Sequence, residues 1–170
     1  MSTHGLNLPV KFYNVAALSL TLFALILWGY KFLRKMTLKA RSTIIYGYFI
    51  GYGFNDFQAK CFTAQSAHET AGWTSDLYNT ANNCFGMKYT SAGRCDGEYL
   101  GYAYYMTIEN SCNDLRFWYN TERNKITSTP LVINSLADYV SFLKNCGYFE
   151  DTEENYLNGC QEFYNQLYVQ

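Results

Sequence analysis

The chain has 170 residues, which is enough for one domain and a short additional segment. Its formal net charge of −1 gives no basic surplus, so the composition argues against nucleic acid as a partner. Aromatic residues make up 19% of the chain, as expected for an aromatic core or for a cleft that stacks on sugar rings. The six cysteines include neither a CxxC pair nor the histidine spacing of a zinc site, so no metal is predicted. They leave open 15 complete disulfide pairings or a set of buried free thiols.

The amino-terminal part of the chain predicts a membrane anchor. From Phe12 to Tyr30 there are 19 consecutive uncharged residues, and about 20 apolar residues suffice to cross a bilayer. A cleaved signal peptide is disfavoured because basic residues stand where the cleavage site should be. A buried globular helix is disfavoured because the segment has no polar face. The predicted organisation is a tail at 1–11, one transmembrane helix at 12–33, a basic linker at 34–40 and a soluble domain at 41–170.

The soluble part predicts helices with one small β-region. Apolar residues at helical spacing predict a helix over 39–52, and Asn55 or Asp56 can cap a second helix that ends near Thr70, with its apolar residues on one face. Residues 73–87 indicate a loop with one helical turn. Tyrosines and glycine turns over 88–105 predict a hairpin or a three-stranded lobe. Three further helices are expected, beginning after Thr107, at Ser135 and near Glu153.

Glu69 stands at the predicted carboxy-terminal end of the second helix. The helix dipole disfavours a negative charge there, and burial beside Phe62 and Trp73 would add desolvation. Both effects raise the pKa of a carboxyl group, as a general acid requires at neutral pH. A histidine-dependent nucleophilic hydrolase is excluded, because the only histidines are His4 and His68 and neither has a plausible nucleophile arrangement.

Four motifs in the soluble part occur in the order found in one enzyme family. They are Ala64–Trp73, Asn82–Lys88, Tyr105–Asp114 and Gly147–Tyr156. Together they resemble the glucosaminidase family of peptidoglycan hydrolases, which includes flagellar and autolysin-type N-acetylglucosaminidases. The resemblance extends over about 100 residues, and one departure is Ala71, where the family usually has glycine.

This resemblance implies a lysozyme-like α+β fold that is mainly helical and carries a small β-lobe. It also implies hydrolysis of the bond between N-acetylglucosamine and N-acetylmuramic acid in bacterial peptidoglycan, without a cofactor. Glu69 matches the family's general acid, and Tyr156 matches a tyrosine that contributes near the end of the domain. The second carboxylate of the family lies in the β-lobe, where Glu98 is the best positional match and Asp96 is the alternative.

Six further residues on or beside these motifs are predicted to bind the substrate. They are Trp73, Asn83, Phe85, Lys88, Tyr89 and Tyr105. Two of these residues, Asn83 and Phe85, also suit purely structural roles. Asn83 also suits the bracing of a loop through hydrogen bonds between side chain and backbone. Phe85 also suits packing.

The resemblance and the anchor together predict a single-pass membrane protein of a virion membrane or a host cell envelope. One lysine precedes the span and five Lys or Arg follow it, so the positive-inside rule places the soluble domain on the cytoplasmic side. A cell-wall enzyme should face the other way, and a membrane inside a virus particle would reconcile the two. We expect peptidoglycan, lipid and other virion proteins as partners of a phage protein that opens the wall locally when the phage enters or leaves the cell. The alternatives are a lytic transglycosylase or muramidase on the same fold and a non-catalytic glycan-binding virion membrane protein.

Overall fold

The computed structural model describes residues 37–91, 93–126 and 133–169, together with Phe23 and Gly29. The chain divides into two units, Met1–Thr37 and Leu38–Gln170. Among the described residues, no helix is long and apolar enough to cross a membrane. The predicted anchor at 12–33 lies almost wholly outside them, so it remains a prediction.

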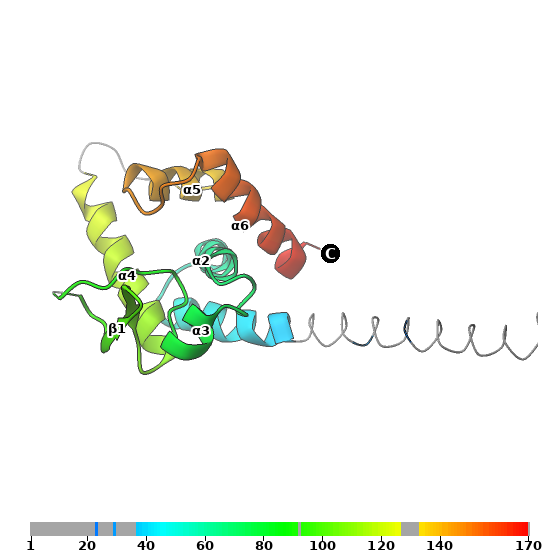
Figure 1. Ribbon diagram of the computed structural model, residues 1–170. Coiled ribbons are helices and arrows are strands. Elements are labelled where there is room, and N and C mark those ends of the chain that lie inside the picture. Colours follow the sequence, from blue (N-terminus) through cyan, green and yellow to red (C-terminus); the bar gives the residue numbers. More distant parts are fainter. Residues whose placement is uncertain (1–22, 24–28, 30–36, 92, 127–132, 170) are drawn as a thin grey trace, which may run out of the picture. The chain divides into compact units, whose positions relative to one another are not determined.

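The second unit is mainly helical, as the sequence predicted (Figure 1). Residues 37–51 are helical, and five further helices follow. They are α2 (Asp56–Glu69), α3 (Asp76–Ala81), α4 (Ile108–Lys125), α5 (Leu136–Asn145) and α6 (Glu153–Tyr168). The predicted caps are confirmed, because the side chains of Asn55, Thr107 and Ser135 accept hydrogen bonds from the third helical residue of α2, α4 and α5.

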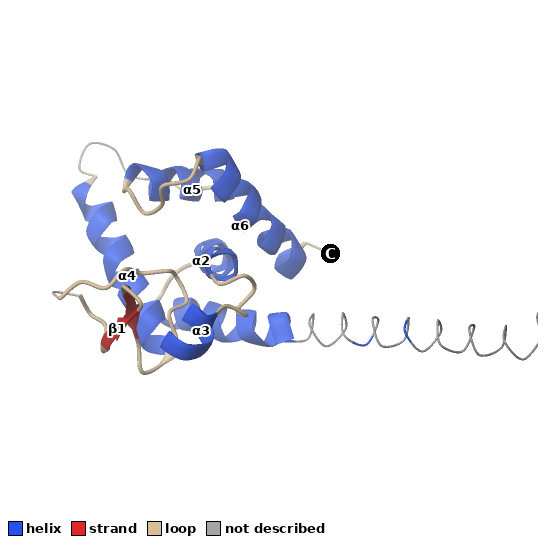
Figure 2. Ribbon diagram, in the orientation of Figure 1, coloured by secondary structure: helices blue, strands red, loops and turns tan. Residues whose placement is uncertain are grey.

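A two-stranded antiparallel sheet forms the β-lobe between α3 and α4 (Figure 2). Strand β1 (Gly97–Tyr99) pairs with β2 (Tyr102–Tyr104), and the tight turn between them uses Leu100 and Gly101, both at positive φ. An isolated bridge joins Lys88 to Tyr102 on the other side of β2. The predicted hairpin is therefore confirmed, with one short additional pairing.

Helix α2 lies at the centre of the core. The aromatic ring of Phe62 on α2 is surrounded by the rings of Phe49, Phe54, Tyr119 and Tyr139, at centroid distances of 4.5–5.4 Å. Residues 61–67 are all buried, so the second half of α2 is covered on every side rather than on the single apolar face that the sequence predicted. This burial fixes the end of α2 on which the carboxylate of Glu69 stands.

The close approach of α6 to α2 gives a stability prediction. A Cβ added at Gly159 on α6 would lie 2.2 Å from the ring of His68, so the imidazole would have to move. We expect Gly159→Ala to lower the free energy of unfolding by about 1–3 kcal/mol, because over-packing displaces a neighbouring side chain. Chemical denaturation of the full-length chain in detergent measures this change.

Gly47→Ala is the matched control for that experiment. Gly47 is exposed on the helix of residues 37–51, and an added Cβ would meet no atom within 4 Å. It should raise the free energy of unfolding by up to about 1 kcal/mol, because alanine favours a helix more than glycine does. A Gly159→Ala protein as stable as its Gly47→Ala counterpart would show that the α2–α6 contact is looser than described.

Candidate functional site

The geometry of the site begins with a sharp reversal of the chain after Glu69. Helix α2 ends at Glu69, and the next residues Ala71, Gly72 and Trp73 all have positive φ, at 50°, 69° and 62°. Trp73 is fully buried, and its indole Nε1 donates a hydrogen bond to Ser66 Oγ at 2.9 Å. Glu69 is therefore the last residue of the central helix α2, directly before this turn. It also gives a physical reason for a glycine preference at position 71, because positive φ suits glycine.

Tyr156 from α6 holds the Glu69 carboxyl in place. Its hydroxyl donates a hydrogen bond to Glu69 Oε1 at 2.5 Å, across 87 residues of sequence. The ring of Tyr156 is itself fixed, because it stacks on Phe149 at 3.8 Å and meets His68 edge-on at 4.8 Å. The structure therefore brings together Glu69 and Tyr156, each of which the family resemblance matched to a functional position.

The loop after α3 covers the other oxygen of the same carboxyl. Gly86 has φ of +63°, and a Cβ added there would lie 2.9 Å from Glu69 Oε2. A side chain at this position would press on the carboxyl, so glycine permits both the backbone conformation and the close approach. The carboxyl of Glu69 thus lies between the hydroxyl of Tyr156 and the backbone of the loop.

These surroundings set the protonation of Glu69. Burial raises the pKa of the Glu69 carboxyl, and the hydrogen bond from Tyr156 offsets part of that rise because it favours the charged form. The residue as a whole is only partly buried, so part of Glu69 reaches the surface. A raised pKa favours the protonated form, which a general acid needs.

Tyr148 is a site residue that the sequence did not single out, although it lies within the Gly147–Tyr156 motif. Its hydroxyl donates a hydrogen bond to the carbonyl oxygen of Phe85 at 2.5 Å, so it fastens the loop that touches Glu69. Burial and then the nearby charge of Glu69 raise the pKa of Tyr148, which keeps it a donor. The only sequence signal for this role is a tyrosine after the glycine that ends α5.

Asn83 braces the same loop from inside. Its amide nitrogen donates to the carbonyl oxygens of Met87 and Ala103, both at 2.9 Å. Its amide oxygen accepts from the backbone N–H groups of Phe85 and Met87. Asn83 is fully buried, and its hydrogen bonds within the described part of the chain all go to backbone groups, which agrees with the bracing role that the sequence left open.

Four of the predicted substrate-binding residues lie in the core instead of on a cleft wall. Trp73, Asn83, Phe85 and Tyr105 have at most 1% of their surface exposed. The hydroxyl of Tyr105 donates to Asp114 Oδ2 at 2.6 Å. A side chain with no exposed face offers nothing to a sugar, so these four residues support the site and do not contact substrate in this conformation.

Lys88 and Tyr89 are exposed and remain predicted substrate contacts. The ammonium of Lys88 lies 3.9 Å from the centroid of the Tyr102 ring. Lys88 also lines a groove of about 290 Å³ between the β-lobe and α4, with Arg94, Phe117 and Trp118 among its other lining residues. Cationic and aromatic groups of this kind suit a charged glycan.

The structure places the two candidates for the second carboxylate differently. Asp96 accepts hydrogen bonds from the Met106 amide at 2.8 Å and from Asn110 Nδ2 at 3.1 Å, so it braces the start of α4. Glu98 is exposed on β1, and its side chain accepts from the Gly101 amide at 3.2 Å. Both carboxylates are exposed, but the hydrogen bonds of Asp96 tie it to the start of α4, so Glu98 stays the preferred candidate and Asp96 the alternative.

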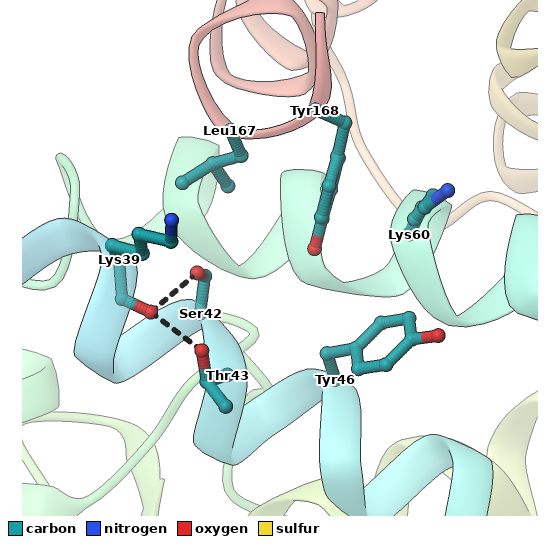
Figure 3. Close-up of a pocket in the computed structure, with 7 residues that line it drawn as sticks. All are labelled: Lys39, Ser42, Thr43, Tyr46, Lys60, Leu167 and Tyr168. Atoms are coloured by element: carbon teal, nitrogen blue, oxygen red, sulfur yellow. Dashed lines mark hydrogen bonds between the residues drawn. The ribbon is translucent and has the colours of Figure 1, made fainter.

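A second cavity, of about 210 Å³, lies among α2, α6 and the helix of residues 37–51 (Figure 3). Tyr168 points into it between Tyr46 and Ser42, whose hydroxyl donates to the Lys39 carbonyl oxygen at 2.8 Å. None of the residues around Glu69 lines this cavity. It is separate from the candidate site.

Comparison with known proteins identifies the fold. No protein-family model matches the chain, and no curated protein matches it in sequence. The structure is similar to the crystal structure of the catalytic domain of the autolysin Auto from Listeria monocytogenes, with a TM-score of 0.52. The match covers 81% of this chain and 87% of that domain, at 18% sequence identity. The two share a fold.

The shared fold agrees with the lysozyme-like α+β architecture that the sequence predicted. Its mainly helical body and small two-stranded sheet are both present in the described residues. No group of three or more His, Cys, Asp or Glu within this part of the chain could hold a metal ion. The candidate site consists of the carboxyl of Glu69, the hydroxyls of Tyr156 and Tyr148, and the backbone of the loop after α3.

Proposed function

We propose that the chain is a peptidoglycan hydrolase that cleaves glycosidic bonds of the bacterial cell wall, of the N-acetylglucosaminidase type. The observation that carries the proposal is the Glu69 carboxyl, whose pKa burial raises, whose Oε1 accepts a hydrogen bond from Tyr156 and whose Oε2 lies close to Gly86. The fold shared with an autolysin catalytic domain and the four sequence motifs support the same reaction class.

In this proposal, Glu69 donates its proton to the oxygen of the scissile glycosidic bond. The leaving sugar departs as an alcohol, and positive charge develops at the anomeric carbon. Glu98 on the β-lobe is the carboxylate that we assign to activating water or to stabilising that charge. The hydrogen bond from Tyr156 to Oε1 holds the Glu69 carboxyl in one orientation. Lys88 and Tyr89 contact the glycan.

Glycan strands freed of their peptides test the reaction class. A glycosidase shortens such strands, an amidase or peptidase leaves their length unchanged, and a protein that only binds glycan sediments with them intact. We expect the full-length chain in detergent to shorten the strands, as measured by chromatography of the soluble fragments. Intact strands after incubation with folded protein would refute the proposal in favour of a binding role.

Tyr156→Phe gives a test through pH. The variant removes the hydrogen bond that favours the charged form of Glu69, so the pKa of Glu69 should rise further. Because the protonated form is the active acid, the alkaline limb of the kcat/KM profile should move to higher pH. The lost bond should also cost about 0.5–1.5 kcal/mol of stability.

Tyr164→Phe is the control, since Tyr164 lies on the same helix and burial rather than Glu69 raises its pKa. An alkaline limb that stays in place in Tyr156→Phe, with strand shortening intact, would show that Glu69 is not the group that titrates.

We further propose that residues 12–33 anchor the enzyme in a membrane, either of a phage virion or of the host envelope. The uncharged run and the basic residues after it support this proposal. Protease treatment of intact native membranes or particles tests it. Protection of the domain would agree with the orientation given by the positive-inside rule, and cleavage would agree with a domain that faces the wall. Extraction by salt alone, without detergent, would exclude the anchor.

A further inference from the structure

Two buried cysteines stand at the base of the β-lobe. Cys84 precedes the lobe in the loop after α3, and Cys112 follows it in the second turn of α4. The 27 residues between them, 85–111, contain both strands and the loop that touches Glu69. A link between these two cysteines would close the lobe where the chain enters and leaves it.

The two cysteines are close neighbours in space. The backbone N–H of Cys84 donates to Ser111 Oγ at 3.0 Å, which ties the loop to the residue next to Cys112. The two side chains interact, because Cys84 raises the pKa of Cys112 after the larger effect of burial. Both side chains have 0% of their surface exposed, and both lie near the hydroxyls of Tyr48 and Tyr78.

We propose that Cys84 and Cys112 form a disulfide bond when the protein folds in an oxidising compartment. The reaction is thiol–disulfide exchange with an external disulfide, such as oxidised glutathione or an oxidised dithiol protein. The two thiols together lose two electrons and two protons, one sulfur–sulfur bond forms, and the external disulfide is reduced to two thiols. This proposal does not depend on the reaction that Glu69 carries out.

The bond forms before the lobe has packed. Burial and the neighbouring Cys84 raise the pKa of Cys112, which disfavours its thiolate, and both sulfurs are buried out of reach of an oxidant. Oxidation after folding should therefore be slow, and oxidation during refolding should be fast.

Cys61 on α2 and Cys160 on α6 are the strongest rival pair. Both are buried, and burial, then the charge of Glu69 and then that of Cys61 raise the pKa of Cys160. Among the described residues, no hydrogen bond joins residues 60–62 to residues 159–161, whereas Cys84 is bonded to the residue next to Cys112. The remaining cysteines, Cys95 and Cys146, are partly exposed.

Peptide mapping of the full-length chain tests the proposal. The chain is refolded in detergent with a glutathione redox buffer, its free thiols are alkylated under denaturing conditions, and it is digested without reduction. We expect one linked peptide pair that contains Cys84 and Cys112. Six alkylated cysteines, or Cys84 linked to a different cysteine, would overturn the proposal.

A Cys84–Cys112 disulfide should also raise the thermal stability of the oxidised protein. A cross-link that closes a loop of this length should raise the Tm of the oxidised protein by roughly 5–10 °C over the reduced one. Cys112→Ser should abolish this oxidant-dependent rise, and Cys146→Ser should retain it. A rise that persists in Cys112→Ser would assign the stabilisation to another pair and contradict the proposal.

Discussion

Replacing Glu69 with glutamine is expected to lower kcat on purified peptidoglycan by roughly 10³-fold, the contribution typical of a positioned general acid. The amide keeps the shape of the side chain and can still accept the Tyr156 hydrogen bond, but it has no proton to give to the leaving oxygen. Binding of the glycan should change little. The measurement is kcat and KM for release of soluble fragments by the full-length chain in detergent.

The same variant should be at least as stable as the wild type at neutral pH. Burial raises the pKa of Glu69 in the folded state above its unfolded value, so the folded chain binds the proton more tightly. Stability from this group is therefore present at low pH and is lost as pH rises through the folded pKa. Glu69→Gln removes that loss, so its advantage over wild type should grow with pH.

Glu154→Gln is the control for this prediction. Glu154 is exposed in the first turn of α6, and the same chemical change there should leave kcat unchanged. If Glu69→Gln retained wild-type kcat while remaining folded, another group would have to supply the proton. The assignment of Glu69 would then be wrong.

Asn83→Ala should cause the largest loss of stability of any single change at the loop. Its amide makes four hydrogen bonds to backbone groups, all in a fully buried position. Removing it leaves the N–H groups of Phe85 and Met87 without their acceptor and takes one donor from the carbonyl oxygens of Met87 and Ala103, so we expect a loss of about 3–5 kcal/mol in the free energy of unfolding. Chemical denaturation of the full-length chain measures it.

The exposed Asn79→Ala is the matched comparison for Asn83→Ala. The amide of Asn79 donates to the carbonyl oxygens of Thr74 and Ser75, but water can replace it there, so the loss should stay below about 1 kcal/mol. Equal losses in the two variants would mean that the Asn83 network is accessible to water. The loop would then not be a rigid support for Glu69.

The helices and their starts could be predicted from sequence because their signals are local. Asn55, Thr107 and Ser135 each satisfy a free N–H group at the start of a helix, and that requirement can be read from a few adjacent residues. The place of Glu69 at the end of a helix could be predicted for the same reason, since it is local information. Its hydrogen bond with Tyr156 could not be predicted from local signals, because 87 residues separate the two.

The roles of the aromatic residues could not be predicted, because burial depends on long-range packing. Trp73 and Tyr105 have polar atoms that suit a sugar, but their partners in the structure are Ser66 and Asp114 inside the fold. The sequence gives no sign of these partners. The role of Tyr148 in the candidate site could not be predicted either, since its contact is to a backbone carbonyl, which no residue type reveals.

Analysis of the new chain ends tests the central claim most directly. Purified peptidoglycan is digested with the full-length chain, the products are reduced with borohydride, and the terminal sugars are identified by mass spectrometry. We predict reduced N-acetylglucosamine ends from the wild type and none above background from Glu69→Gln. Reduced muramic acid or 1,6-anhydromuramic acid ends would contradict the N-acetylglucosaminidase assignment, and equal release of ends by both proteins would contradict the role of Glu69.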